Sequence, residues 1–513
     1  MADKASGSAP AAELTERELE ATPEAKALRA EHKFIGHPRG VGTLAAMQMF
    51  NSFANYTMSA LLVYYLYATV QDGGLGLSQT DAAQLISLYS AASILAGLIG
   101  SVVADRILGP RKALMLSRAT QAVAFTILAI PGMGVVGYAA SQVLLVIGAM
   151  ICGRSLDALT GKMYEPDDGR RDGAFTINYV ISNIGACVPA IAGAIALVTG
   201  YHGAFAVGAV AAICGVVLYF STQRFFGPIG SRPDDPMPAA KAKQFVAILV
   251  VCVVVFVAVF AFLFLSATIT VKQFSSTLST AAIFIPLVYL VYIIKSKKTK
   301  PEEAKHVIAL IPLYVCNCLS MLVWTQSTSI IAIYTEQNVD LNLFGVTISP
   351  ATFQTVPAVA AIVWGAIVTA LWTKLGKKQP SNPGKIGLGT IFWGLGPVFM
   401  CLPFLLIPAG VKVSPLWIIG FYLIIIILGE ALNSPTGYAA ATIVAPGAFA
   451  TQMVTVWSLS QSTGAGLSTL VSPLYVEGAE VPYFLAIGGV TIVVGLLVTV
   501  FAKKLAKGMG IDD

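Results

Sequence analysis

The predicted helix Met47–Tyr67 is crowded with polar side chains and contains no charged residue. Its amide, hydroxyl and phenol groups are Gln48, Asn51, Ser52, Asn55, Tyr56, Thr57 and Ser59. These groups form hydrogen bonds, but the amides and alcohols do not gain or lose a proton near neutral pH. The pattern therefore predicts recognition of a polar solute without acid–base chemistry at these positions.

Glu430 is a carboxylate in the middle of an otherwise apolar run of Ile and Leu. An acid at that depth in a hydrophobic segment indicates a functional site, with a purely structural pairing as the alternative. Pro435 and Gly437 follow it closely and predict a break in the helix that helps a site to form.

Arg154 and Asp157 are three residues apart in a predicted helix and share one of its faces. One interpretation is a local pair in which the two charges neutralise each other. In the other, Arg154 reaches across the molecule to Glu430 as a gate latch, because a guanidinium suits a bidentate carboxylate partner.

The elements that carry these residues are predicted to be membrane-spanning helices. Only 11% of the 513 residues are charged and 56% are apolar, whereas soluble domains carry about 25% charged residues. Apolar runs occur at Gly42–Tyr67, Ala82–Leu108, Ala113–Met133, Gly137–Met163, Phe175–Thr199, Ala204–Gln223, Phe245–Ser266, Ser276–Ile294, Val307–Tyr334, Ala351–Leu375, Ile386–Pro408, Pro415–Val444, Gln452–Leu474 and Tyr483–Lys503.

This spacing predicts an all-α polytopic protein with two six-helix bundles and two extra helices between them. The expected organisation is a polar tail at 1–39, a bundle at 40–226, a linker with two helices at 227–305, a bundle at 306–504 and a tail at 505–513. Lys and Arg cluster in alternate connections across all fourteen runs, which predicts that both termini are cytoplasmic. The net charge of +6 follows from this topology and does not indicate nucleic-acid binding.

Several classes of function are not indicated. The seven cysteines lie in apolar runs without CxxC spacing, so we expect neither a metal site nor a disulfide framework. No GxxxxGK[ST] loop and no catalytic constellation is recognisable, so we expect no cofactor, no ATP hydrolysis and no enzyme activity. Two six-helix bundles joined by a linker predict a secondary transporter with its site near the middle of the membrane, between the bundles.

The connection "GSVVADRILGPRKALML" joins the second and third runs. It resembles the G-x-x-x-D-R-x-x-G-x-R loop of the major facilitator superfamily. The resemblance implies that Asp105, Arg106 and Arg111 latch one helix against the facing half in one conformational state. The alternative is an interfacial charge cluster that only follows the distribution of positive charge.

Three further stretches, "YEPDDGRRDGAFTINYVISNIGA", "LGEALNSPTG" and "APGAFATQMVTVWSLSQSTG", resemble the proton-dependent oligopeptide transporter (POT) family. This resemblance covers almost the whole chain after the polar tail. It implies uptake of di- and tripeptides driven by protons. We expect a monomeric carrier in a bacterial cytoplasmic membrane that works by alternating access. Positions that match the family's pocket are Tyr56, Tyr89, Asn183, Glu430, Ser434 and Trp457, to which Asn55 and Gln326 are added as neighbouring candidates.

The family's charged motif is neutralised in this chain. Its first helix usually reads Glu-x-x-Glu-Arg-Phe, followed by paired tyrosines and another arginine. Gln48 and Asn51 stand at the glutamates, Ser52 and Ser59 at the arginines, and Asn55 at the first tyrosine. A lysine of the fourth helix falls on Gly153, a glutamate of the seventh on Thr325, and an asparagine of the eighth on Pro357. Acids and bases are lost together, because an unpaired charge in the membrane costs about 2.5–3.5 kcal/mol or more.

These replacements leave three functions open. The first is a peptide carrier without proton coupling. The second is a uniporter or potential-driven carrier of an amine-bearing compound that is not a peptide, since the amine partner Glu430 is retained while the carboxylate-binding cations are lost. The third is a receptor that does not transport.

Overall fold

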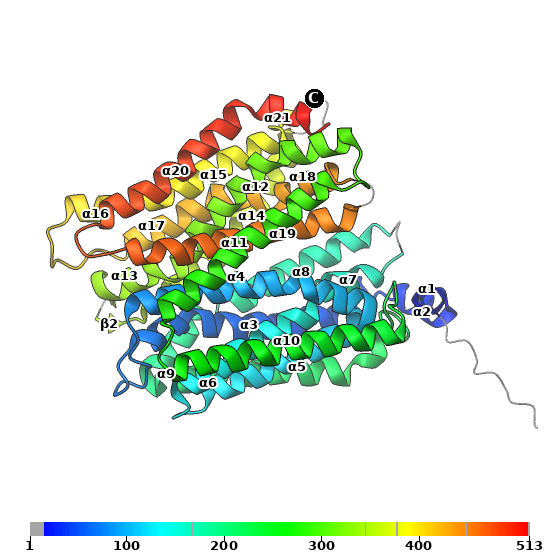
Figure 1. The fold of residues 1–513 in the computed structure, drawn as a ribbon, viewed down its shortest axis with the longest axis horizontal. Helices are drawn as coiled ribbons and strands as arrows, with labels where there is room; N and C mark the ends of the chain where they lie inside the picture. Colours follow the sequence, from blue (N-terminus) through cyan, green and yellow to red (C-terminus); the bar gives the residue numbers. More distant parts are fainter. Residues whose placement is uncertain (1–14, 166–167, 344, 376–377, 447–448, 511–513) are drawn as a thin grey trace, which may run out of the picture.

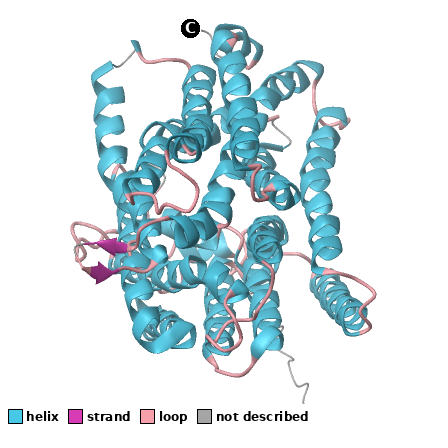
Figure 2. Ribbon diagram, turned by 90° about the vertical axis from the view of Figure 1, so that its left-hand side faces the viewer, coloured by secondary structure: helices cyan, strands magenta, loops and turns pink. Residues whose placement is uncertain are grey.

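The computed structural model describes residues 15–165, 168–343, 345–375, 378–446 and 449–510. Helices make up nearly all of it, and the described part holds one short strand pair, β1 (Asn342–Leu343) with β2 (Val346–Thr347) (Figure 2). The described helices form two bundles that lie one above the other, and the first and last described helices lie at the same end of the molecule (Figure 1). We call this the terminal end, and the end that carries β1 and β2 the distal end.

Each predicted span falls on one, two or three consecutive helical segments. The first bundle contains α3 (Arg39–Tyr67), α4 (Gln79–Val103) with the π-helical turn η1 (Ala104–Leu108), α5 (Pro110–Ala129), α6 (Gly134–Cys152), α7 (Ser155–Lys162), α8 (Arg170–Ala186) and α9 (Pro189–Ser221). Gly200 has φ +74° within α9, which divides it into the end of the fifth span and the sixth span. The short helix η2 (Gln223–Phe225) follows.

The second bundle repeats this plan. It contains α12 (Pro301–Thr328), α13 (Ile330–Asn338), η3 (Pro350–Gln354), α14 (Thr355–Leu375), α15 (Asn382–Phe399), α16 (Cys401–Leu406), α17 (Leu416–Ile424), the π-helical segment η5 (Ile425–Glu430), α18 (Ala431–Ile443), α19 (Ala450–Val471), η7 (Ser472–Leu474), α20 (Glu480–Val500) and α21 (Ala502–Gly508). Nine helices of the described chain are long and apolar enough to cross a membrane, judged by length and composition. The first, α3, is not among them, because its amides and hydroxyls lower its mean hydropathy.

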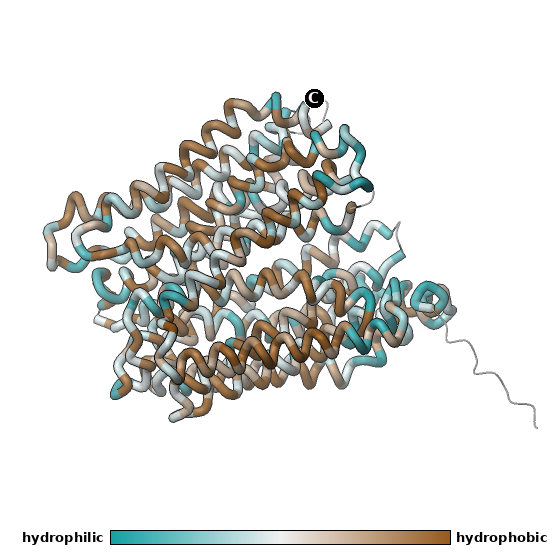
Figure 3. The backbone as a smooth tube through the Cα atoms, viewed as in Figure 1, coloured by the Kyte–Doolittle hydropathy of each residue, from teal (hydrophilic) through white to brown (hydrophobic). Residues whose placement is uncertain are grey.

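Two additional helices connect the bundles. The first, α10 (Ala239–Leu265), has no buried residue among those described. Figure 3 shows that most of its length is hydrophobic. The second, α11 (Val271–Lys295), packs against α4 and α19. Phe260 of α10 meets Phe274 of α11 with ring centroids 4.8 Å apart. Exposed apolar residues over a full helix length fit contact with lipid, as the sequence predicts for this region.

The predicted polar tail contains structure that the sequence analysis missed. The helices α1 (Glu16–Glu20) and α2 (Pro23–Arg29) pack on the terminal end of the first bundle. The ammonium group of Lys162 lies 2.5 Å from Glu20 Oε1, 2.6 Å from Asp234 Oδ1 and 3.8 Å from Glu16 Oε1. Glu16 accepts hydrogen bonds from the backbone N–H groups of Gly230 and Arg232, and its burial raises the pKa of its carboxyl above the ordinary value.

The two bundles are joined at the distal end by neutral hydrogen bonds. Tyr64 of α3 donates to the carbonyl of Ala332 over 3.2 Å, and Gln84 of α4 donates to the carbonyl of Thr469 over 3.2 Å. Ser87 and Ser468 lie 3.1 Å apart through their hydroxyls. These groups are buried, so this end of the interface is closed in the present conformation.

Candidate functional site

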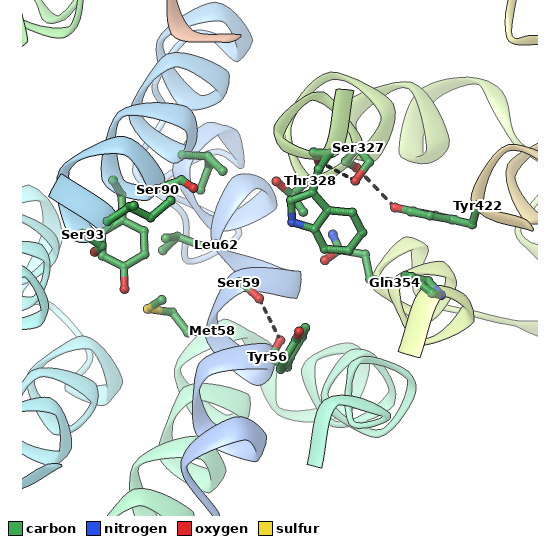
Figure 4. Close-up of a pocket in the computed structure, with 15 residues that line it drawn as sticks. Tyr56, Met58, Ser59, Leu62, Ser90, Ser93, Ser327, Thr328, Gln354 and Tyr422 are labelled. Carbon is green, nitrogen blue, oxygen red and sulfur yellow. Dashed lines mark hydrogen bonds between the residues drawn. The ribbon is translucent and has the colours of Figure 1, made fainter. Parts of the chain in front are cut away.

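A cavity of about 250 Å³ lies between the two bundles, next to the closed distal end (Figure 4). It receives residues from α3, α4, α12, η3, α14 and α17. Its lining consists of Tyr56, Met58, Ser59, Leu62, Ile86, Tyr89, Ser90, Ser93, Ile94, Trp324, Ser327, Thr328, Gln354, Pro357 and Tyr422. The predicted residues Tyr56 and Tyr89 are among them, on facing helices of the first bundle. None of these lining residues carries a carboxylate or a basic group.

The polar residues of α3 divide between two faces of the helix. Tyr56 and Ser59 line the cavity, whereas Gln48 and Ser52 face α8, where Ser182 Oγ lies 2.8 Å from Ser52 Oγ and 3.4 Å from Gln48 Nε2. A Cβ added at Gly185 of α8 would lie 2.8 Å from the Cβ of Ser52. The absence of a side chain at Gly185 therefore lets α8 approach α3 closely beside Ser52.

Asn51 and Asn55 are linked to each other within α3. The side-chain amide of Asn55 donates to the carbonyl of Asn51 over 2.8 Å. Neither asparagine belongs to the lining of the cavity described above. Asn55 thus lies beside the candidate site.

Arg118 of α5 is a cation inside the first bundle that the sequence analysis did not identify. Its Nη2 donates to Gln48 Oε1 over 3.2 Å and its Nη1 to Gln121 Oε1 over 2.8 Å, so its partners are neutral amides. Its Nε is buried and has no hydrogen-bond partner among the described residues. The signal was available in the sequence, because Arg118 is the single charge within the predicted span Ala113–Met133.

Glu430 ends the π-helical segment η5 and is partly buried. Its carboxylate is close enough to the phenols of Tyr56 and Tyr179 to interact with both electrostatically. Tyr56 lines the cavity and belongs to the opposite bundle, so Glu430 faces the interface between the bundles. The helix is irregular before Glu430, in η5. After Glu430, α18 continues without interruption to Ile443, so the prediction of a break at Pro435 and Gly437 was wrong. Single π turns inside α-helices frequently mark functional sites.

The remaining predicted pocket residues are not brought together. Asn183 is partly buried and donates to the carbonyl of Tyr179, one turn away on α8. Ser434 belongs to α18, but its side chain lies outside the described residues. Trp457 is buried within the second bundle, where a Cβ at Gly437 would lie 2.0 Å from its ring.

Gln326 and Thr325 are also inside the second bundle. Gln326 Nε2 donates to Ser468 Oγ over 2.7 Å, and Tyr483 donates to its Oε1 over 2.6 Å. Thr325 donates to the carbonyl of Met321 in its own helix. The structure therefore assigns Gln326 to helix packing, and it is not one of the residues that line the cavity.

Arg154 crosses between the bundles, as one of the two interpretations of its position predicts, but with other partners. Its Nη2 donates to the hydroxyl of Tyr438 over 2.9 Å and to Ser458 Oγ over 2.6 Å. Its guanidinium lies 5.0 Å from the centroid of the Tyr438 ring. The local pair with Asp157 is also present, at 3.5 Å, with both side chains about half exposed.

Gly153 precedes Arg154 and adopts φ +50°, which ends α6 and starts a new helix, α7. A Cβ at this position would lie 2.5 Å from the backbone nitrogen of Ser101 and 2.6 Å from the carbonyl carbon of Gly100. Real Cβ atoms do not come that close to backbone atoms. No side chain fits at position 153 without separating α4 from α6.

The residues of the Asp105–Arg111 connection bind the segment that follows the last helix of their own bundle. Arg106 pairs with Asp235 at 3.0 Å, and the carbonyl of Asp105 accepts from the backbone N–H of Asp235. Arg111 donates to the carbonyl of Gln223 over 3.0 Å. In this conformation these described contacts stay within the first bundle and the linker, and the predicted latch to the facing half is not seen.

The chain was compared with known families and structures. A family model described as "POT family" matches residues 123–493. The "Di-/tripeptide transporter" of Lactococcus lactis subsp. cremoris is 32% identical over 491 residues, which cover 94% of this chain and 98% of that protein. The "Peptide transporter YePEPT" of Yersinia enterocolitica is 24% identical over 447 residues, covering 84% and 86%.

Solved structures agree with these relatives. The crystal structure of "peptide transporter POT in complex with sulfate" has a TM-score of 0.90 and 33% identity, and the match covers 95% of this chain and 100% of that one. A "POT family transporter in complex with 5-aminolevulinic acid" gives a TM-score of 0.86 and 29% identity over 92% and 98% of the chains. The all-α fold of two helix bundles is therefore the major facilitator fold of these proteins, as predicted. Together, the matched residues, the shared fold and the cavity between the bundles show that the chain belongs to the POT family of transporters.

Proposed function

We propose that this protein carries short peptides or peptide-like compounds across the membrane by alternating access. The observation that supports this function is the cavity between the bundles, with Glu430 interacting electrostatically with the lining residue Tyr56. Relatives with the names di-/tripeptide transporter and peptide transporter agree with it. The bundles would rock about this site, with the distal hydrogen bonds broken in one state and the Arg154 contacts in the other.

We further propose that protons do not drive this transport. Coupling requires a group that binds a proton in one state and releases it in the other. Gln48, Asn51 and Thr325 stand where the family's sequence pattern places charged residues, and none of them titrates. Arg118 interacts with Gln48 as a permanently charged group, so it does not restore this function.

The location of the protein follows from the same reasoning. We propose a bacterial cytoplasmic membrane, with the terminal end in the cytoplasm, because Lys and Arg are concentrated in the connections at that end. We propose a monomer without catalytic activity. The lipid bilayer and the transported solute are then its only expected partners.

An amine-bearing compound that is not a peptide is a second candidate substrate. Glu430 supplies a partner for an amine, and no cation stands among the lining residues of the cavity to meet a carboxylate. A structural neighbour was crystallised with 5-aminolevulinic acid, which also carries an amino group.

Uptake into liposomes tests both parts of the proposal. Counterflow of a labelled neutral dipeptide, with unlabelled dipeptide inside, is expected to proceed and distinguishes a carrier from a receptor. With a pH gradient imposed and the potential clamped at zero, we expect no accumulation above the outside concentration. Uphill accumulation under those conditions would contradict uncoupled transport. A cationic substrate is expected to accumulate with potential alone, which supplies about 2.3 kcal/mol per charge per 100 mV.

A further inference from the structure

Three hydroxyl groups on the second-bundle side of the cavity present acceptor oxygens. Ser327 donates its hydroxyl proton to the carbonyl of Trp324 over 2.6 Å, and Thr328 donates to Thr325 over 3.0 Å. Tyr422 donates to the carbonyl of Ser327 over 3.2 Å. Because these protons are bound by backbone carbonyls, the hydroxyl oxygens keep lone pairs for a ligand that donates.

Two buried polar groups in the described lining, the hydroxyl of Ser93 and the side-chain amide of Gln354, have a hydrogen-bonding atom without a partner. The side-chain amide nitrogen of Gln354 is buried and makes no hydrogen bond with any described residue. Gln354 is 7% exposed and lines the cavity from η3, on the side of the second bundle (Figure 4). A buried amide N–H without a partner is costly, so a ligand carbonyl that accepts from it stabilises the complex.

The cavity is unsuited to a carboxylate. An ionised carboxylate needs a cation or several converging donors when it leaves water. The described lining supplies no cation, and much of it is apolar, as at Met58, Leu62 and Ile86. Its two unpartnered groups, Ser93 and Gln354, lie on opposite sides of the cavity (Figure 4). Arg154, which could supply charge, is bonded to Tyr438, Ser458 and Asp157 instead.

The volume of the cavity is sufficient for the end of a small ligand that carries an uncharged carbonyl group. A cavity of about 150 Å³ is enough to hold benzene, and this one measures about 250 Å³. A side chain and one carbonyl group fit such a space. Glu430 interacts electrostatically with the lining residue Tyr56, so an anionic partner for a ligand amine lies near this cavity.

We propose that the preferred ligand carries a free amine at one end and an uncharged carbonyl, as an amide or ester, in place of a free carboxylate at the other. The amine faces Glu430, and the carbonyl enters the cavity and accepts from Gln354. This inference rests on the proposed transport function and specifies which peptide-like compounds that function serves.

The experiment uses the full chain in lipid nanodiscs and a matched pair of ligands, leucyl-alanine and leucyl-alanine amide. We expect the amide to bind at least about tenfold more tightly by calorimetry, a difference equivalent to about 1.4 kcal/mol. Gln354→Leu is expected to weaken binding of the amide. Ser59→Arg places a cation at the cavity wall and is expected to increase affinity for the free dipeptide and to reduce or reverse the preference.

The possible results are distinguishable. Equal affinity for both ligands in the unaltered chain would overturn this inference and leave the proposed transport of peptides intact. An unchanged preference in a folded Ser59→Arg variant would also overturn it. If neither compound binds and neither is carried in counterflow, both the inference and the proposed function are wrong. Gln354→Leu provides a second test if Ser59→Arg does not fold.

Discussion

The guanidinium of Arg154 donates to the hydroxyl of Tyr438 across 2.9 Å, which bonds the break between α6 and α7 to α18 of the other bundle. Opening of the terminal end has to break this contact if it moves α7 away from α18. Arg154 is half exposed, so we expect the contact to stabilise the closed terminal end by only about 1 kcal/mol, or about fivefold in population.

Tyr438→Phe together with Ser458→Ala should therefore shift the protein toward a state that is open at the terminal end. The measurement is the distance between spin labels at Arg171→Cys and Thr442→Cys in a cysteine-free background, which we expect to lengthen. Asp157→Asn is the control, because it alters only the local pair. If Asp157→Asn lengthens the distance and the Tyr438 and Ser458 changes do not, the local pair is the functional contact.

Glu430→Gln should weaken the binding of ligands that carry a free amine by about tenfold or more, since hydrogen bonds to charged groups contribute about 1.5–3 kcal/mol. N-acetylated analogues of the same ligands should lose much less affinity. Glu336→Gln, at the distal end of α13, is the matched control and is expected to leave binding unchanged. Equal losses for free and acetylated ligands would show that Glu430 supports the structure only.

Gln48→Glu should raise the apparent melting temperature in nanodiscs. The new carboxylate would lie where Gln48 Oε1 now accepts from Arg118 at 3.2 Å, and it would give a buried cation its counter-ion. We expect a gain of about 1.5–3 kcal/mol, the range for hydrogen bonds between charged groups. The same change in an Arg118→Gln background leaves the new carboxylate without a cationic partner and should lower the melting temperature. A loss in both backgrounds would mean that Arg118 does not need an anion.

Lys162→Met should release the helices α1 and α2 from the bundle. Lys162 is 14% exposed and interacts with three carboxylates, of which Glu16 is almost fully buried. Breaking a buried pair by removal of one partner costs about 3–5 kcal/mol. Hydrogen exchange over residues 15–31 is the readout. Lys33→Met, which removes an exposed pair with Glu31 at 3.6 Å, should have no effect. Protection that persists after Lys162→Met would show that apolar contacts alone hold the segment.

The spans and their order could be predicted because hydrophobic length and the placement of Lys and Arg are properties of the chain itself. The division into two bundles with α10 and α11 between them follows from the same pattern. The polar tail was harder. Its helices α1 and α2 are short, and they are held by Lys162 and by backbone groups near Gly230, more than a hundred residues away.

The candidate site could be predicted only where a residue's depth in a span was informative. Glu430 and Tyr56 were identified, and they lie together at the interface. Gln326 and Trp457 have the same residue types as ligand-binding groups, but the helix face that each occupies is set by packing within the second bundle. Gln354 went unnoticed because a neutral amide near a span end carries no distinguishing pattern, and its missing partner is visible only in three dimensions.

The contact between Gly153 and α4 bears on how this protein could change in future. The two backbones lie at a distance that leaves no room for a Cβ, so a lysine at position 153 cannot be introduced by a single substitution without moving them apart. Such a change first requires larger spacing between α4 and α6, and each intermediate loses packing before it gains a charge. The packing at Gly153 therefore protects the neutral site against gain of a charge there, and a positive charge is more accessible by substitution elsewhere, such as at Ser59.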